Sequence, residues 1–152
     1  FMIHKDFKGC IDELTGISDR IARLRLNIGK KKIVILQVYA PTCASTEEEI
    51  DNFYTLLSET IQICKVNYQN YLVIMGDFNS QVGRKEYSEE NVLGPFGFPR
   101  KRNDRGEKLI NFCQEHHLKV INTFIKKHQG KKWTWLSPNG QHSVMVVRCH
   151  QM

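Results

Sequence analysis

The sequence predicts an α/β fold in which helices cover a β-sheet of mixed topology. Residues 21–28 alternate between apolar and polar side chains, and residues 33–39 are mostly β-branched, so we expect two consecutive strands there. Apolar residues recur at helical spacing between positions 50 and 64, which predicts an amphipathic helix. The run 71–75 is apolar throughout and ends at Gly76, which predicts a central strand buried on both faces.

Length and composition fit one globular domain, which we expect to span residues 1–152. The chain is 41% hydrophobic and 25% charged, and no apolar run approaches the ~20 residues that cross a bilayer. Its five scattered cysteines predict reduced thiols rather than disulfides or a zinc site. A start at Phe1 without a signal-peptide pattern indicates a fragment of an intracellular protein. The net charge of +6 favours a polyanionic partner such as nucleic acid, although many basic proteins bind none.

The first two strands are expected to form a hairpin. The strand at 21–28 has one apolar face and one wet face, and residues 29–32 form a turn longer than the two-residue optimum. Pro41 ends the second strand because proline cannot donate to a β-ladder, which leaves Tyr39 at the strand's carboxyl end. A further strand within residues 1–18 has only a weak signal.

The first helix has a clear start. Thr46 and Glu49 form a capping box, in which each side chain accepts a hydrogen bond from the other residue's backbone N–H. A helix of roughly five turns is expected from there, by the spacing of its apolar residues. That stripe consists of Ile50, Phe53, Tyr54, Leu57, Ile61 and Cys64.

Residues 80–103 lack any period and are punctuated by glycine and proline, which is typical of a functional or disordered loop. The loop ends in the densest positive cluster of the chain, Arg100, Lys101 and Arg102. A solvated loop and a phosphate-contacting one explain this cluster equally well. Asn103 or Asp104 can then cap a second helix. Short strands are expected at 118–122, 133–136 and 144–147.

Asp77 and Asn79 follow the central strand directly, at the end where open α/β sheets bind ligands. Their spacing can aim both side chains the same way, but an Asx-turn that closes the strand is an equally good reading. A phosphodiester-cleaving site needs a base for water, donors to phosphate and usually a divalent cation. Asp77 could supply the base, with Asn79 and Tyr39 as donors. Neither Asp77 nor Asn79 alone would hold Mg²⁺.

Four ordered motifs resemble the endonuclease/exonuclease/phosphatase superfamily. They are Tyr39-Ala-Pro41, Gly76-Asp-Phe-Asn79 and its extension to Gly83, Asn103-Asp-Arg-Gly106, and Trp133-Thr-Trp-Leu-Ser-Pro-Asn-Gly140. The last three are similar to the endonucleases of non-long-terminal-repeat retrotransposons and to craniofacial development protein 2-like sequences. The resemblance covers roughly residues 14–140, and the ordered set is more specific than any single motif.

The resemblance implies a deoxyribonuclease-I-like β-sandwich with flanking helices, incomplete at both ends here. It also implies Mg²⁺-dependent cleavage of DNA or another nucleic acid, in the nucleus or elsewhere in the cell. Tyr39 matches the active-site tyrosine, Asp77 the acid that activates or positions water, and Asn79 the amide beside the scissile phosphate. Thr134 falls where related endonucleases place a polar residue at the rim of the site.

The chain also departs from the family pattern. The metal-binding Glu of an earlier strand, the acid of the Ile-Asp-Tyr strand and the closing Ser-Asp-His all lack counterparts, and no Asp or Glu follows Glu115. His142 and His150 are not preceded by Asp, so neither matches the catalytic histidine. We therefore assign no metal ligand and expect little nuclease activity from these 152 residues. A non-catalytic remnant that binds nucleic acid or protein, and a phosphatase of the same fold, are the alternatives.

Overall fold

The computed structural model describes residues 1–42, 44–64, 70–85, 91–97, 101–126, 135–136, 143–144 and 147–151. Two α-helices, two short 3₁₀ helices (η) and eight strands are defined within them. In chain order they are η1 (Lys5–Cys10), β1 (Ile11–Gly16), β2 (Ile21–Ile28), β3 (Lys31–Tyr39), α1 (Glu47–Ile63), β4 (Asn70–Asp77), α2 (Asp104–Glu115), β5 (Leu118–Val120), η2 (Ile121–Thr123), β6 (Trp135–Leu136), β7 (Ser143–Val144) and β8 (Val147–Gln151).

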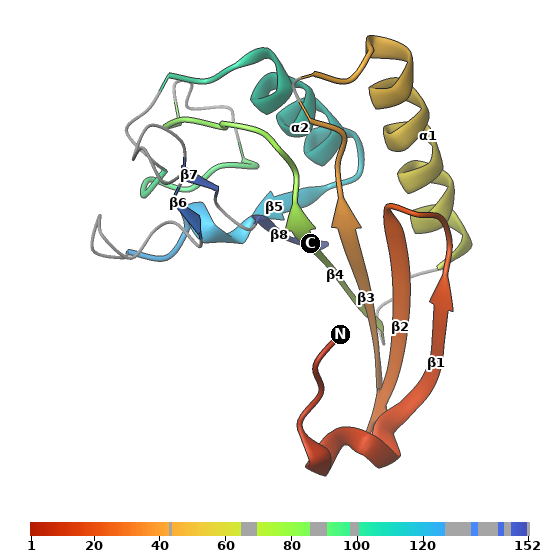
Figure 1. Ribbon diagram of the computed structural model, residues 1–152. Coiled ribbons are helices and arrows are strands. Elements are labelled where there is room, and N and C mark those ends of the chain that lie inside the picture. The colour runs from red at the N-terminus through yellow and green to blue at the C-terminus, as the bar shows by residue number, and fades with distance from the viewer. Residues whose placement is uncertain are drawn as a thin grey trace.

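Six strands form one mixed sheet in the order β1-β2-β3-β4-β8-β5 (Figure 1). Only β3 and β4 are parallel neighbours, and the other adjacent pairs are antiparallel. The remaining two, β6 and β7, pair with each other. The predicted α/β class with a mixed sheet is confirmed, and the weak upstream signal corresponds to β1.

The predicted hairpin of β2 and β3 is confirmed, but its turn is shorter than expected. Ile28 is the register partner of Lys31, so only Gly29 and Lys30 connect the strands. Gly29 has a φ of 61°, a left-handed conformation that glycine adopts without a steric penalty. Lys31 and Lys32, which were expected in the turn, extend the strand instead because their backbones continue the ladder.

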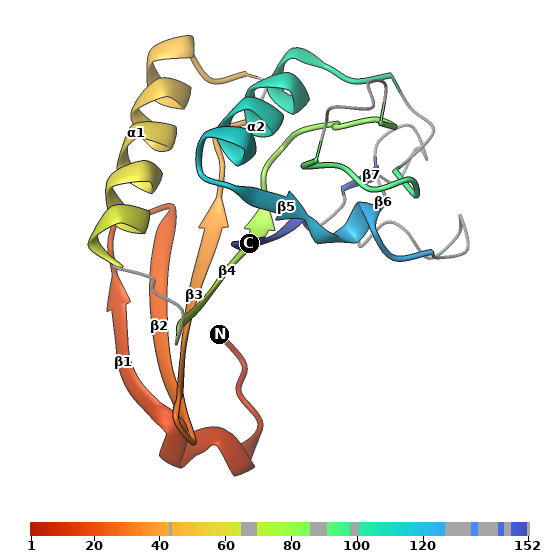
Figure 2. The same cartoon turned by 180° about the vertical axis from the view of Figure 1, so that it is seen from behind.

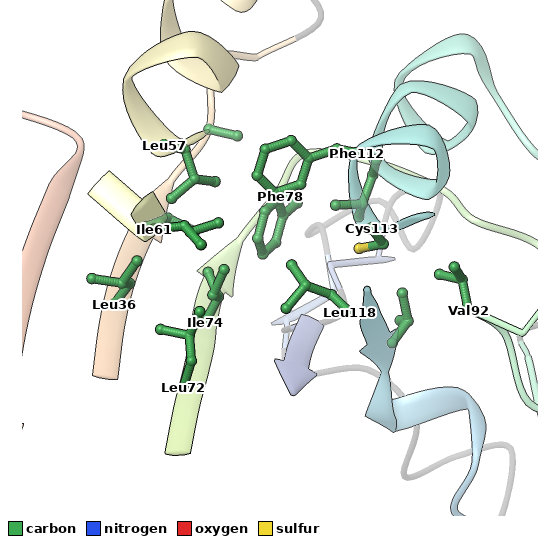
Figure 3. Close-up of a cluster of buried hydrophobic side chains, with 14 of the residues drawn as sticks. Leu36, Leu57, Ile61, Leu72, Ile74, Phe78, Val92, Phe112, Cys113 and Leu118 are labelled. Atoms are coloured by element: carbon green, nitrogen blue, oxygen red, sulfur yellow. The ribbon is translucent and has the colours of Figure 1, made fainter. Parts of the chain in front are cut away.

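Both helices lie next to each other on the same side of the sheet (Figures 1 and 2). Figure 3 shows Leu57 and Ile61 of α1 above Leu36 and Ile74 of the sheet, in the same buried cluster as Phe112 of α2. Leu36 and Ile74 are fully buried at 0% exposure. Burying a side chain of this size contributes about 1.5–3 kcal/mol, so this layer holds the helices to the strands.

The start of α1 is as predicted. Thr46 Oγ1 accepts from the Glu49 N–H at 3.2 Å, and Glu49 Oε2 accepts from the Thr46 N–H at 2.8 Å, which completes the capping box. The helix has 17 residues, close to the expected five turns. No helix among the described residues is long and apolar enough to cross a membrane.

Strand β4 is central, as predicted, but only one of its faces is fully buried. Leu72 and Ile74 have 0% exposure beneath the helices, whereas Tyr71 on the opposite face is 36% exposed. The expectation of two buried faces is wrong for this residue, because both helices occupy the same side of the sheet.

The C-terminal strands also differ from expectation. The structure has β7 at Ser143–Val144 and β8 at Val147–Gln151, in place of one strand at 144–147. Strand β8 inserts between β4 and β5, and its pairing with both is antiparallel. The strand predicted at 118–122 ends at Val120, where η2 begins.

Candidate phosphodiester site at the ends of strands β3 and β4

The register of β3 and β4 places Tyr39 beside Asp77. The two residues are partners at the carboxyl ends of the parallel strands. The Ala40 N–H donates to the Asp77 carbonyl at 2.8 Å, which continues the pairing by one residue. Side chains of register partners project from the same face of a sheet. The structure thus brings together two of the three predicted catalytic residues, and the Tyr39 side chain is open to solvent, with the residue 51% exposed.

Asn79 joins the two strand ends. Its backbone N–H donates to Asp77 Oδ1 at 2.9 Å, and its Nδ2 donates to the Ala40 carbonyl at 2.7 Å. Its φ of 47° is left-handed, a conformation that asparagine tolerates better than most residues. The Asx-turn reading is therefore correct, and the same turn also places Asn79 at the site. Among the described residues, the Asp77 carboxylate has only this backbone hydrogen bond.

Gly76 permits the close approach of β4 to β3 at this point. A Cβ added to it would lie 1.8 Å from the Val38 carbonyl oxygen, and its φ is 148°. Real side chains do not occupy either geometry without backbone movement. The glycine of the Gly-Asp-Phe-Asn motif is thus needed for the position of Asp77.

The loop after Asn79 is fastened to the start of α2. Asn103 Oδ1 accepts from the Gln81 N–H at 3.0 Å and from the Gly106 N–H at 2.8 Å, and so caps the helix as predicted. The Arg102 Nε donates to the Val82 carbonyl at 3.1 Å, and its Nη1 bonds Glu107 at 2.9 Å. These contacts hold the backbone that follows the site.

The positive cluster at 100–102 separates into different roles. Arg102 has a side chain only 7% exposed and is engaged with the loop, so its position supports a structural role. Lys101 is exposed. Arg100 and Thr134 lie outside the described residues, so the predictions made for them stay predictions.

Strand β8 occupies the position next to Asp77's own strand. Val147 is in register with Gly76, and Arg148 with Met75. No residue of β8 is Asp or Glu. Strand β8 therefore brings no carboxylate to β4.

The described residues do not fit a magnesium site. No group of three or more His, Cys, Asp or Glu residues among them could hold a metal ion. Of the three residues at the strand ends, only Asp77 has a carboxylate, and its Oδ1 already accepts from Asn79. Mg²⁺ requires near-octahedral oxygen ligation that usually includes one or two carboxylates.

One neighbour of Tyr39 was missed by the sequence reasoning. Arg20 precedes β2, and its carbonyl accepts from the Tyr39 N–H at 2.9 Å. Its guanidinium carbon lies 5.8 Å from the centroid of the Tyr39 ring. Its position in the sequence could have indicated this contact, because Arg20 is the last residue before the strand that forms a hairpin with the Tyr39 strand.

Comparisons with known proteins identify the family and the fold of the chain. No protein-family model matches the chain. Craniofacial development protein 2 of Bos taurus is 32% identical over 153 residues, which covers 99% of this chain and 25% of the relative. The protein of the same name from Tragulus javanicus is 33% identical, over 88% of this chain and 23% of the relative. The chain is a homologue of craniofacial development protein 2. It spans about a quarter of the length of these relatives.

The homology confirms the resemblance inferred from the four motifs. Among solved structures, the endonuclease domain of TRAS1, a telomere-specific non-LTR retrotransposon, superposes with a TM-score of 0.59. It is 12% identical, and the match covers 94% of this chain and 55% of that domain. The chain therefore has the deoxyribonuclease-I-like endonuclease fold that the resemblance implied, in partial form.

Proposed function

We propose that the chain binds a nucleic-acid phosphodiester at the ends of β3 and β4, with Tyr39, Asp77 and Asn79 facing the phosphate. The main supporting observation is that Tyr39 and Asp77 are register partners. Asn79 links the two strand ends by hydrogen bonds to Asp77 and to the Ala40 carbonyl. The endonuclease-like fold and the net charge of +6 support a nucleic acid as the ligand. Binding in the nucleus or another nucleic-acid compartment is part of this proposal.

The three side chains supply different chemistry at such a site. The Tyr39 phenol can donate a hydrogen bond to a phosphate oxygen, and the Asn79 amide is a neutral polar group beside it. The Asp77 carboxylate can accept a proton from water, or orient that water, during hydrolysis. An ionised Asp77 also repels the phosphate when no cation lies between them.

We propose further that hydrolysis needs Mg²⁺ together with the family's metal-binding Glu and Asp-His pair, for which this sequence has no counterparts. The departures of the sequence and the unsuitable donor set support this. A nicking assay with supercoiled plasmid and Mg²⁺ tests it. We expect no nicking above the Asp77→Ala variant, because the metal-binding Glu and the closing Ser-Asp-His of the family have no counterparts in this sequence. Nicking that Asp77→Ala abolishes would show that the chain is an active nuclease.

Binding itself is measured by fluorescence anisotropy with labelled duplex and single-stranded oligonucleotides over a series of salt concentrations. We expect the logarithm of the affinity to fall linearly with the logarithm of salt, since each neutralised phosphate of a duplex contributes a slope of about −0.9. Asp77→Ala should retain this dependence. The nucleic-acid proposal fails if neither ligand binds at low salt.

A further inference from the structure

We infer that Arg20 is a further phosphate-binding residue, which contacts a nucleic-acid phosphate next to the one held at Asp77. The inference rests on the proposed function, and its starting point is a row across the sheet. Tyr39 is in register with Asp77 on one side, and its N–H bonds the Arg20 carbonyl on the other. Ile21 pairs with Val38, so Arg20 is opposite Tyr39. Arg20, Tyr39 and Asp77 thus form one row at one edge of the sheet.

This row places a positive charge within reach of the same ligand. Adjacent strands are about 4.8 Å apart, so the backbones of Arg20 and Asp77 are roughly 10 Å apart. The next phosphate of the same nucleic-acid strand can lie on either side of the one held at Asp77. If the nucleic acid runs across the row from β4 towards β2, that next phosphate lies at Arg20.

Tyr39 orients the Arg20 guanidinium but leaves several of its N–H groups free to bind a ligand. The guanidinium lies 5.8 Å from the ring centroid, within the range of a cation–π contact, and Nη1 donates to the Tyr39 carbonyl at 3.4 Å, near the limit for a hydrogen bond. Stacking on the ring leaves N–H groups at the edge of the guanidinium plane, where arginine binds phosphate in bidentate fashion. The side chain is 32% exposed, so a ligand can reach it.

Nearby carboxylates do not neutralise this charge. Asp19 is the acidic partner, but its Oδ2 lies 3.9 Å from Arg20 Nε and its side chain is 85% exposed. Exposed pairs of this geometry contribute little. Glu49 lines the same surface hollow as Arg20 and Asp19, and its carboxylate is engaged in the capping box of α1. The Arg20 charge is therefore available to an anion.

The first test compares salt dependence in two variants that remove one positive charge each. Lys30 is the matched control, because it is exposed in the turn at the opposite end of the same hairpin. We expect Arg20→Gln to reduce the slope of log affinity against log salt by about 1, whereas Lys30→Gln leaves it unchanged. Arg20→Lys should keep the slope, because it keeps the charge, and should bind more weakly than the parent chain.

The second test needs no variant and so does not depend on folding of a mutant. Phenylglyoxal modifies accessible arginines, and mass spectrometry measures each site in the native chain. Arg25 is the control, since its side chain is 35% exposed and it lies in β2, about 17 Å along the chain from Arg20, which directly precedes that strand. We expect duplex DNA to slow the modification of Arg20 and to leave Arg25 unaffected.

The outcomes separate this inference from the proposed function. If the parent chain shows no salt-dependent binding, the proposed function itself fails. If it binds, but Arg20→Gln and Lys30→Gln change the slope equally or DNA leaves Arg20 unprotected, then Arg20 has no such role and only the inference fails.

Discussion

Within β1, Glu13 accepts contacts from three side chains, whereas Asp77 at the end of β4 accepts one hydrogen bond among the described residues, from a backbone N–H. Thr15 Oγ1 and Arg23 Nη2 bond Glu13 Oε1 at 2.5 and 2.8 Å, and Arg25 Nη1 lies 3.0 Å from Oε2. The Thr15 hydrogen bond, followed by Arg23, lowers the pKa of Glu13 below its ordinary value. Asp77 has only the Asn79 N–H at 2.9 Å among the described residues.

The difference indicates which charges stabilise the fold and which can serve a ligand. A carboxylate surrounded by fixed donors contributes to the native state, and its removal leaves those donors without their acceptor. A carboxylate with one local contact, beside an exposed tyrosine, can still interact with an incoming molecule. The sequence alone does not distinguish a charge that stabilises the fold from one that can bind a ligand. Arg23 and Arg25, which bind Glu13, carry the same charge as Arg20.

The largest expected effect tests whether the geometry of the Asp77 edge depends on Gly76. Gly76→Ala places a Cβ 1.8 Å from the Val38 carbonyl oxygen, so β4 must move away from β3. We expect a loss of about 3 kcal/mol or more in the free energy of unfolding, measured by urea denaturation. Gly16→Ala is the control, because a Cβ added at Gly16 would have nothing within 4 Å. Equal stability of the two variants would show that the strands do not approach as described.

The next two predictions replace each carboxylate by the corresponding amide, beginning with Asp77. Asp77→Asn keeps an oxygen for the Asn79 N–H and removes the repulsion of phosphate, which is worth about 0.7 kcal/mol for charges 6 Å apart in water. In EDTA we therefore expect roughly threefold tighter duplex binding by anisotropy, with little change in thermal stability. Asp12→Asn, an exposed acid on β1, controls for net charge and should bind as the parent chain does.

Glu13→Gln should behave in the opposite way. It removes the charge that Arg23 and Arg25 share, so we expect a lower thermal midpoint and unchanged affinity for DNA. If Glu13→Gln alters binding as much as Asp77→Asn does, then the two carboxylates do not differ in the way proposed.

Much of the Asp77 edge could be predicted from the sequence because its elements have local signals. The capping box, the hairpin and the strand ends at Tyr39 and Asp77 follow from spacing and from proline and glycine. Strand patterns predicted that Tyr39 and Asp77 each lie at a carboxyl end, but only the structure shows that β3 and β4 are parallel neighbours, which brings the two residues together.

The remaining features depend on contacts that no local pattern specifies. Arg20 becomes part of the row only through the register of β2 with β3, and Arg102 acquires a structural role because loop carbonyls happen to surround it. The insertion of β8 between β4 and β5 pairs residues more than 70 positions apart. Periodicity indicates that such a segment is a strand, and it does not indicate the partner.

The smallest effect concerns His116, which links the two helices. His116 caps α2, its Nε2 lies 2.8 Å from Ser58 Oγ of α1, and its ring packs on Phe112 at 4.5 Å. Burial lowers the pKa of His116 below its ordinary value, with Glu115 opposing and His117 reinforcing this shift. The folded state therefore binds fewer protons than the unfolded state near pH 6, and stability should rise with pH through this range.

The pH dependence can be assigned to this residue by substitution. The stabilisation is complete above the unfolded pKa of about 6.5 and is lost as pH falls towards the lower folded value. Urea midpoints at pH 7.5 and pH 5.5 should differ more for the parent chain than for His116→Gln, which keeps a hydrogen-bonding group near Ser58. His117→Gln, on the exposed neighbour, is the control and should retain the parent's difference. Equal pH dependence in His116→Gln would mean that His116 is not the titrating group. DNA binding should be the same in both variants, because His116 contacts Ser58 and Phe112 of the helices and the proposal gives neither histidine a role.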